Sequence, residues 1–268
     1  SAASDVYKRQ ILYLLTGAAA GLSAGLLGIG GGLIIVPILF FIFSHQHIPT
    51  EHVMHMALAT SLATIIVTSI SSARAHHKRG AVLWRIVADL SPGIVIGAWL
   101  GAMFASALAS DILKPIFGVF ELLVAIHLMV NYRPVTHTTS ISRTKSITGG
   151  TVIGSISSVV GIGGGTLTVP FLLWHNISIR NAVATSAACG FPIAVAGTAG
   201  YVISGWNTVG LPAYTLGYVN LSAFALIIIT SIVTAPVGAN LAHKLPERTL
   251  RTVFAIFLLA LSLKMLLF

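Results

Sequence analysis

Charged residues are scarce in this chain. Asp and Glu together number 6 and Lys and Arg 15 among 268 residues, so charged side chains make up 8% of the sequence. Hydrophobic residues reach 56%, and the mean hydropathy is +0.94. A water-soluble domain of this length has too little interior to hide so much apolar surface. The composition therefore excludes a soluble globular protein and indicates several membrane-spanning segments.

Cysteine is almost absent, because Cys189 is the single one. An intrachain disulfide and a cysteine metal cluster are therefore excluded. His52 and His55 stand at a spacing that can hold a metal ion, but a solvated turn is the commoner reason for such a cluster. We expect no metal and no other cofactor. The formal net charge of +9 is explained better by the cytoplasmic loops of a membrane protein than by a nucleic-acid surface, so no nucleic-acid partner is expected.

The apolar runs do not alternate with polar residues, as the strands of a membrane barrel would over about ten residues. They are continuous and about twenty residues long or more, which is typical of membrane helices. We therefore predict an all-α polytopic membrane protein. The apolar stretches cover approximately residues 11–43, 53–72, 83–108, 112–130, 147–174, 182–203, 216–242 and 250–268.

A cluster of glycines occurs twice within this apolar sequence. The five residues from Gly28 to Gly32 and those from Gly161 to Gly165 both read Gly-Ile-Gly-Gly-Gly, and a proline follows each at the same distance. Glycine costs a helix about 1 kcal/mol relative to alanine. Each cluster therefore predicts a break in a membrane helix, and the duplication predicts two homologous halves.

Further matches occur in the same order in both halves. Ala57–Ser61 resembles Ala182–Ser186 in the pattern A-x-A-T-S, and the pairs Gly97-Ala98 and Gly238-Ala239 are identical. The repeat predicts four parts: a leader of truncated or foreign origin at 1–10, a first membrane repeat at 11–130, a cytoplasmic linker at 131–146 and a second membrane repeat at 147–268.

The placement of lysine and arginine distinguishes two topologies. If every apolar stretch crosses once, Lys244, Arg248 and Arg251 fall outside, against the tendency of basic residues to stay cytoplasmic. If the two glycine-broken segments instead re-enter on the side from which they came, each half keeps three crossings and the halves have opposite orientations. The loops 73–86, 131–146 and 243–251 then lie inside. We favour these inverted repeats, although the sequence leaves both arrangements open.

The glycine clusters are candidates for an anion site. Glycine lets backbone N–H groups turn toward a ligand and approach it closely, and a helix that begins after the break adds the positive end of its dipole. The alternative is that the small residues serve close helix packing. The duplication favours a binding site shared by both halves, formed by Gly28, Gly30, Gly31, Gly32, Gly161, Gly163, Gly164 and Gly165.

Hydroxyl groups recur downstream of both glycine clusters. Thr60 and Ser61 match Thr185 and Ser186, and hydroxyls can donate to an oxyanion without introducing a charge into the bilayer. Such side chains also bond to their own helix or to a neighbouring helix, and the sequence leaves both roles open. We expect these four residues to join the glycines in binding the anion.

Two ionisable residues lie deep in the stretch 112–130. Glu121 and His127 are six positions apart, so they point to different faces of a helix. An ionisable residue inside a membrane is expensive and is by default a functional candidate. Glu121 could carry a coupling proton, but neither residue has a counterpart in the second half, and the sequence does not assign either a role.

The repeated G-x-G-G-G-x4-P pattern with a downstream A-x-A-T-S resembles the sulfite exporter TauE/SafE family over residues 11–268. The resemblance implies a multi-pass secondary transporter of the cytoplasmic (inner) membrane for small anions: sulfite, organosulfonates, or related sulfur oxyanions and carboxylates. The family name points to export, but the sequence leaves the direction of transport open. An anion channel and a non-transporting accessory subunit are the alternatives, and a homodimer is left open. No enzymatic activity is expected, since the apolar stretches lack paired aspartates and a G-x-S-G nucleophile.

The inverted topology predicts that His243 is cytoplasmic and that residues 206–212 are external. After replacement of Cys189, a cysteine at His243 should resist an impermeant thiol reagent in intact cells, whereas one at Asn207 should react. External labelling at position 243 would contradict the inverted arrangement.

Overall fold

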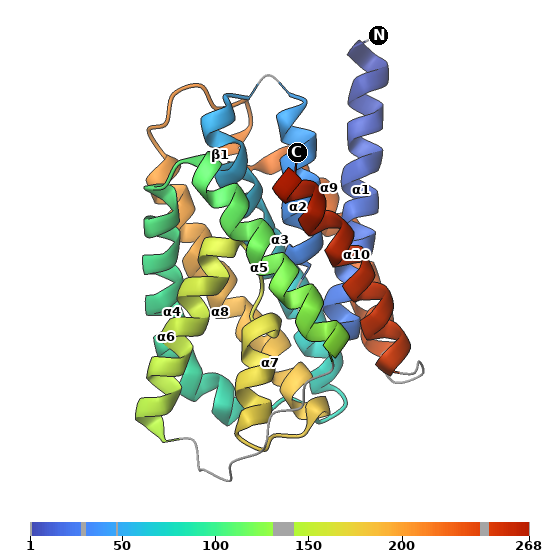
Figure 1. Cartoon of the computed structure of the whole chain (residues 1–268), viewed down its shortest axis with the longest axis vertical. Helices are drawn as coiled ribbons and strands as arrows, with labels where there is room; N and C mark the ends of the chain where they lie inside the picture. Colours follow the sequence, from blue (N-terminus) through green and yellow to red (C-terminus); the bar gives the residue numbers. More distant parts are fainter. Residues whose placement is uncertain (1, 28–30, 47, 131–141, 242–246, 268) are drawn as a thin grey trace.

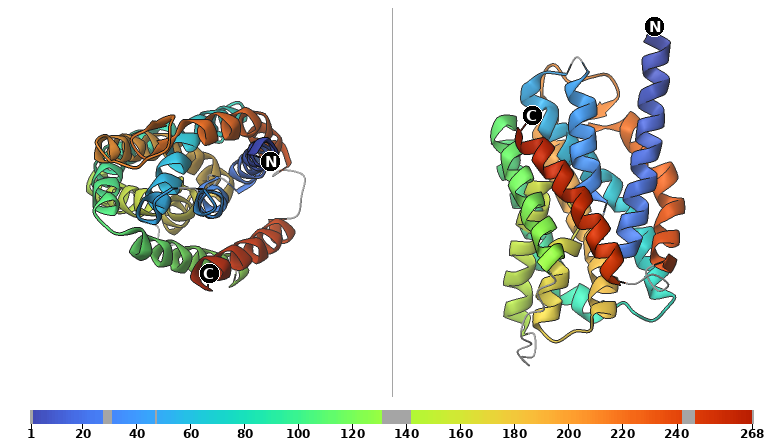
Figure 2. Two further views of the ribbon diagram at one scale, coloured as in Figure 1. Left: turned by 90° about the horizontal axis from the view of Figure 1, so that it is seen from above. Right: turned by 45° about the vertical axis from the view of Figure 1, so that its right-hand side comes forward.

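The chain forms a bundle of helices with one short hairpin (Figures 1 and 2). The computed structural model describes residues 2–27, 31–46, 48–130, 142–241 and 247–267. The helices are α1 (Ala2–Leu27), α2 (Gly32–Ser44), α3 (Thr50–His77), α4 (Trp84–Ser106), α5 (Ser110–Val130), α6 (Arg143–Val160), α7 (Gly165–Trp174), α8 (Ile179–Gly205), α9 (Leu221–Leu241) and α10 (Glu247–Leu267). Strands β1 (Thr215–Leu216) and β2 (Val219–Asn220) pair antiparallel, with Thr215 opposite Asn220.

Five of these helices, α3, α4, α5, α8 and α9, are long and apolar enough to span a membrane. Within the most apolar part of each, 83% of residues are buried in α3 and 67% in α8, against 28% in α5 and in α9. The two central helices therefore pack on protein along most of their length, while α5 and α9 offer most of their surface to lipid. The all-α polytopic membrane class predicted from the sequence is confirmed.

Corresponding helices of the two halves run in opposite directions (Figure 1). α3 runs down the view and α8 up it, and the same opposition holds for α4 and α9 and for α5 and α10. α2 turns back toward the end of the molecule where α1 begins, and α7 turns back toward the end where α6 begins. Each glycine-broken segment therefore enters the bundle and returns to the end from which it came.

Helices of one half pack mainly against helices of the other half in several of the largest contacts. α1 packs against α9, and its counterpart α6 packs against α4; α3 packs against α9, and α8 against α4. α3 contacts α8 directly, as α5 contacts α10. The largest helix contacts of α1, α4, α6 and α9 thus join the two halves, whereas α2 and α7 pack mainly on α3 and α8 of their own half.

Glycine stripes allow the closest of these contacts. On α4, a Cβ added at Gly93, Gly97 or Gly101 would stand 2.1, 2.1 or 2.4 Å from a carbonyl oxygen of α6. Gly17 and Gly25 of α1 meet carbonyl oxygens of α9 at 2.2 and 2.0 Å in the same test. In lipid, where apolar burial between helices supplies little drive, this backbone approach is what holds helices together.

Helices reach into two stretches that the sequence division set apart. Residues 2–10 form the first turns of α1, and their origin as a leader stays a prediction. α6 begins at Arg143, inside the stretch 131–146 assigned to the cytoplasmic linker, where the Ser142 side chain caps the helix by accepting from the Lys145 N–H. The location of this linker stays a prediction.

The packing at Gly97 predicts a stability loss on adding one methyl group. Gly97→Ala would force α4 away from the Thr151 carbonyl, and the strain should cost about 1–3 kcal/mol and lower the melting temperature in detergent. Ile96→Ala, at the lipid-facing neighbour that is 53% exposed, is the control and should melt close to the wild type. Equal melting of Gly97→Ala and wild type would mean that the α4–α6 contact is looser than described.

Candidate functional site

The second glycine cluster ends one helix and starts another within a few residues. Gly161 follows α6 in a left-handed conformation with φ +67°, which glycine adopts at little cost. Its N–H donates to the Ser158 carbonyl and the N–H of Ile162 to the Ser157 carbonyl, which closes α6 in a Schellman motif. α7 begins at Gly165 with Gly164 as its N-cap residue. The predicted helix break is therefore present in the second half.

The two glycine-broken segments meet at the centre of the bundle. A Cβ at Gly32, the first residue of α2, would lie 2.6 Å from the Gly161 carbonyl oxygen and 2.7 Å from Ile162 Cα. The Ser61 hydroxyl of α3 donates to the same Gly161 oxygen at 2.7 Å. The N-terminus of α2 thus packs against the turn that joins α6 to α7. The N-termini of α2 and α7 each carry the positive end of a helix dipole.

Donor groups at the start of α7 are left unpaired. Neither α2 nor α7 has a side-chain cap. Within the part of the chain that the structure describes, the N–H groups of Gly163, Gly164 and Gly165 have no partner. The Thr168 hydroxyl is wholly buried and likewise without a described partner, and it would stand 3.0 Å from a Cβ at Gly164. Unpaired donors at a helix N-terminus form a ready anion site.

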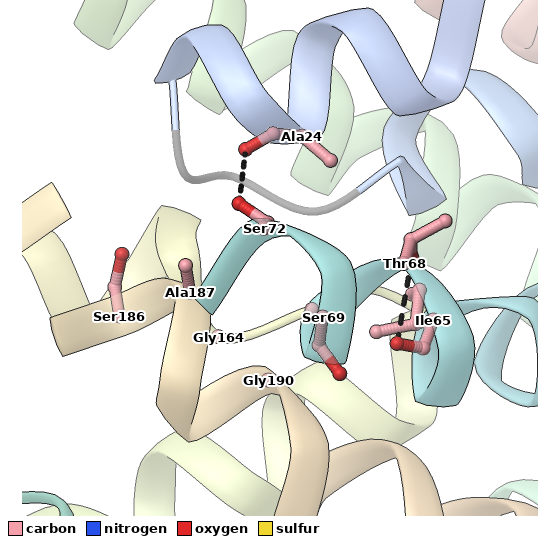
Figure 3. A pocket seen from close by; sticks show the side chains of 10 residues that line it. Ala24, Ile65, Thr68, Ser69, Ser72, Gly164, Ser186, Ala187 and Gly190 are labelled. Atoms are coloured by element: carbon pink, nitrogen blue, oxygen red, sulfur yellow. Dashed lines mark hydrogen bonds between the residues drawn. The ribbon is translucent and has the colours of Figure 1, made fainter. Parts of the chain in front are cut away.

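A small cavity adjoins these donors, with room for about one water molecule. It lies between α3, α8, the end of α1 and the segment at Gly164 (Figure 3). Four serines and threonines and three glycines are among the described residues that line it, and no lysine or arginine is, but the surface they turn toward the cavity is apolar. The lining residues are Ala24, Ile65, Thr68, Ser69, Ser72, Gly163, Gly164, Ser186, Ala187 and Gly190.

The two predicted threonines join the halves at corresponding places. The Thr60 hydroxyl of α3 accepts from the N–H of Asn220 at 2.9 Å, directly before α9. The Thr185 hydroxyl of α8 accepts from the N–H of Leu83 at 3.1 Å, directly before α4. Each threonine therefore satisfies a backbone donor at the start of a helix from the other half. Neither lines the cavity, so their contact with an anion stays a prediction.

Of the two predicted serines, one lines the cavity and the other does not. Ser186 lines the cavity, and its hydroxyl donates to the Val183 carbonyl at 2.8 Å, whereas Ser61 is used to hold Gly161. Gly31 and Gly32 lie at the start of α2. Gly28 and Gly30 lie outside the described residues.

Glu121 and His127 are remote from the cavity, because α5 contributes no residue to its walls. Glu121 is wholly buried, and neither carboxylate oxygen has a partner among the described residues. His127 is exposed. The ring nitrogens of His55 contact the carbonyl oxygens of Glu51 and Leu108 at 3.0 and 2.9 Å, so this histidine ties α3 to the α4–α5 connection. Glu121 therefore does not line this cavity, and a role for it in carrying a coupling proton stays a prediction.

Ser69, Ser72, Thr168 and Gly190 were missed by the sequence analysis. Ser72 follows Ser61 and Thr68 on one face of α3, since the intervals of seven and four residues complete helical turns. That periodicity was a usable signal. Gly190 gives no comparable signal, because only the packing of α8 against α3 and the segment at Gly164 brings it to the cavity. Thr168 does not line the cavity, and only the start of α7 places it next to Gly164.

Three relatives cover nearly the whole chain. A probable membrane transporter protein of Haemophilus influenzae is 40% identical over 258 residues, which are 96% of this chain and 98% of that relative. A probable membrane transporter protein of Methanocaldococcus jannaschii is 30% identical over 264 residues, 96% of this chain and 95% of its own. One from Bacillus subtilis is 27% identical over 245 residues, 89% and 91% of the two chains. No solved structure matches the chain.

The family described as sulfite exporter TauE/SafE matches residues 13–265. The match spans both glycine clusters and every helix of the bundle. Together with the transporter names of its relatives, it makes this polytopic protein a membrane transporter. The chain belongs to the sulfite exporter TauE/SafE family.

Proposed function

We propose that this protein is a secondary transporter of small anions, with sulfite, small sulfonates and related sulfur oxyanions as its substrate class. The observation that carries the proposal is the set of unpaired N–H groups at Gly163, Gly164 and Gly165. They stand at the start of α7, close to the turn on which α2 packs and beside a small cavity whose lining residues include serines and threonines. Membership of the sulfite exporter TauE/SafE family supports the choice of anion.

The chemistry of this site suits an anion that must be released again. Backbone donors and helix dipoles favour negative charge without a fixed cation. A buried lysine or arginine would hold the anion tightly and would burden the empty site with an unpaired charge. A cradle of N–H groups and hydroxyls stays neutral when empty, and water can satisfy it between transport steps.

Transport requires the site to open to each side in turn. We infer that the two halves are inverted repeats and that they move relative to each other around the place where α2 packs against the turn between α6 and α7, as in other transporters with broken helices at the midplane. The cavity has space for only about one water molecule. The conformation described is therefore a closed one, and binding must separate α3 from α8 by a small distance.

The proposed cradle predicts selectivity for compact oxyanions, because donors that converge on several oxygens bind a charged acceptor best. Sulfite and ethanesulfonate should raise the melting temperature of the purified protein in a concentration-dependent manner. Dimethyl sulfone, a neutral compound of similar shape, should leave it unchanged. Equal stabilisation by the sulfone would show that charge plays no part in binding.

Gly190→Ala offers a test that separates binding from folding. A Cβ at position 190 would lie 3.4 Å from Ser69 Cβ, an ordinary contact, and 4.0 Å from the Gly164 nitrogen. Alanine also favours the α8 helix by up to about 1 kcal/mol. The variant should fold and melt like the wild type or better. Its anion affinity in calorimetry should fall about tenfold or more, because the methyl group occupies the space in front of the donors.

Gly31→Ala is the matched comparison from the first half. A Cβ there would stand 2.6 Å from Ala20 Cβ, so this substitution should cost stability as well as binding. A Gly190→Ala protein that folds normally and keeps full anion affinity would place the binding site elsewhere.

A further inference from the structure

A second and larger cavity lies beside the small cavity at Gly163 and Gly164, which we call the glycine site. Its volume is about 340 Å³, within the range of small-molecule pockets, about 300–1,000 Å³. It is an open pocket flanked by the last turns of α3, the first turns of α4 and the middle of α8. We call it the basic vestibule, and its lining residues are Ser69, Ile70, Ala73, Arg74, His77, Trp84, Val87, Ser91, Ala188, Phe191 and Pro192.

The rim of the basic vestibule carries a cation. Arg74 is exposed and lies in the last turn of α3. Among the described residues it has no acidic partner. The neighbouring rim is held in place by the Trp84 indole, whose Nε1–H donates to His77 Nδ1 at 3.0 Å with the rings edge to face. An unpaired guanidinium on a fixed rim is available to a carboxylate, sulfonate or sulfite group.

The walls of the basic vestibule are mostly apolar. Val87 of α4 and Phe191 and Pro192 of α8 face it, and Ser69 and Ser91 add hydroxyls. A bare oxyanion would leave most of this surface unused. An anion with a short hydrocarbon part could place its charge at Arg74 and its carbons against the apolar wall, which adds a hydrophobic contribution to binding.

Ser69 connects the basic vestibule to the glycine site, since it lines both cavities. Its hydroxyl donates to the Ile66 carbonyl of its own helix at 3.1 Å, and its side chain stands next to Gly190. A small side chain that bonds within its helix is a slight barrier between two cavities. Rearrangement of α3 against α8 at this point would join them.

We propose that the basic vestibule is a second anion-binding site, which captures a small organic anion at Arg74 at the end of the molecule where α3 and α4 connect and passes it by Ser69 to the donors at the start of α7. This inference rests on the proposed function and deepens it, because it adds a capture site that favours, within the proposed substrate class, anions with a short hydrocarbon part. The vestibule sets the apparent affinity from that side, while the cradle carries out the translocation step.

The test is concentration-dependent uptake of ethanesulfonate into vesicles of pure phosphatidylcholine, counting only protein molecules whose α3–α4 end faces the supplied anion. Arg74→Gln should raise the half-saturating concentration about five- to tenfold at low salt with little change in maximal rate, and the difference should shrink as salt screens the charge. Arg85→Gln is the matched control, because it removes a cation next to Trp84 that does not line the cavity. It should stay close to the wild type.

Each outcome bears on a separate claim. If the wild type takes up no anion of the series, the proposed function fails and takes the vestibule with it. If the wild type transports and Arg74→Gln behaves like Arg85→Gln, the vestibule alone is overturned. An effect of Arg74→Gln that appears only after phosphatidylglycerol is added would assign Arg74 to a lipid headgroup and would also overturn it.

Discussion

The constraint on which the whole structure depends is the need to satisfy backbone hydrogen bonds away from water. A helix that starts or ends within a membrane leaves N–H or C=O groups without partners, and lipid supplies none. Such a break is tolerated only where protein or a water-filled cavity surrounds it. Here the break after α6 is closed at Gly161 by carbonyl groups of α6 and by Ser61 of α3. Among the described residues, N–H groups at the start of α7 stay without a partner. The same physical necessity that requires the break to be buried leaves the unpaired donors on which the proposed anion site depends.

The pairing of halves follows from that necessity. Because α1 packs on α9 and α6 on α4, the first helix of each broken segment is covered by a helix of the other half. Glycine stripes let these pairs approach until backbone meets backbone. The hydroxyls of Thr60 and Thr185 then satisfy the donors at the starts of α9 and α4. The centre is thus built from reciprocal contacts, and a movement of one half must change the surroundings of both breaks together.

Part of this arrangement could be read from the sequence. Continuous apolar runs identified the membrane helices, and the duplicated Gly-Ile-Gly-Gly-Gly with its A-x-A-T-S companion indicated the family and the helix break after α6. The role of Thr60 and Thr185 could not be read in the same way, since a hydroxyl on a helix face has the same sequence signature whether it meets an anion or a backbone N–H. Gly190 and Thr168 escaped because their importance arises from packing around Gly164, which no local pattern encodes.

In the proposed mechanism, both broken segments serve a single central anion site rather than two independent ones. Equilibrium binding of labelled sulfite to the purified protein, with the amount of folded chain determined independently, tests this claim most directly. One anion per chain at concentrations that saturate the high-affinity phase is the predicted result. Two equivalent anions per chain, or no saturable binding, would contradict it.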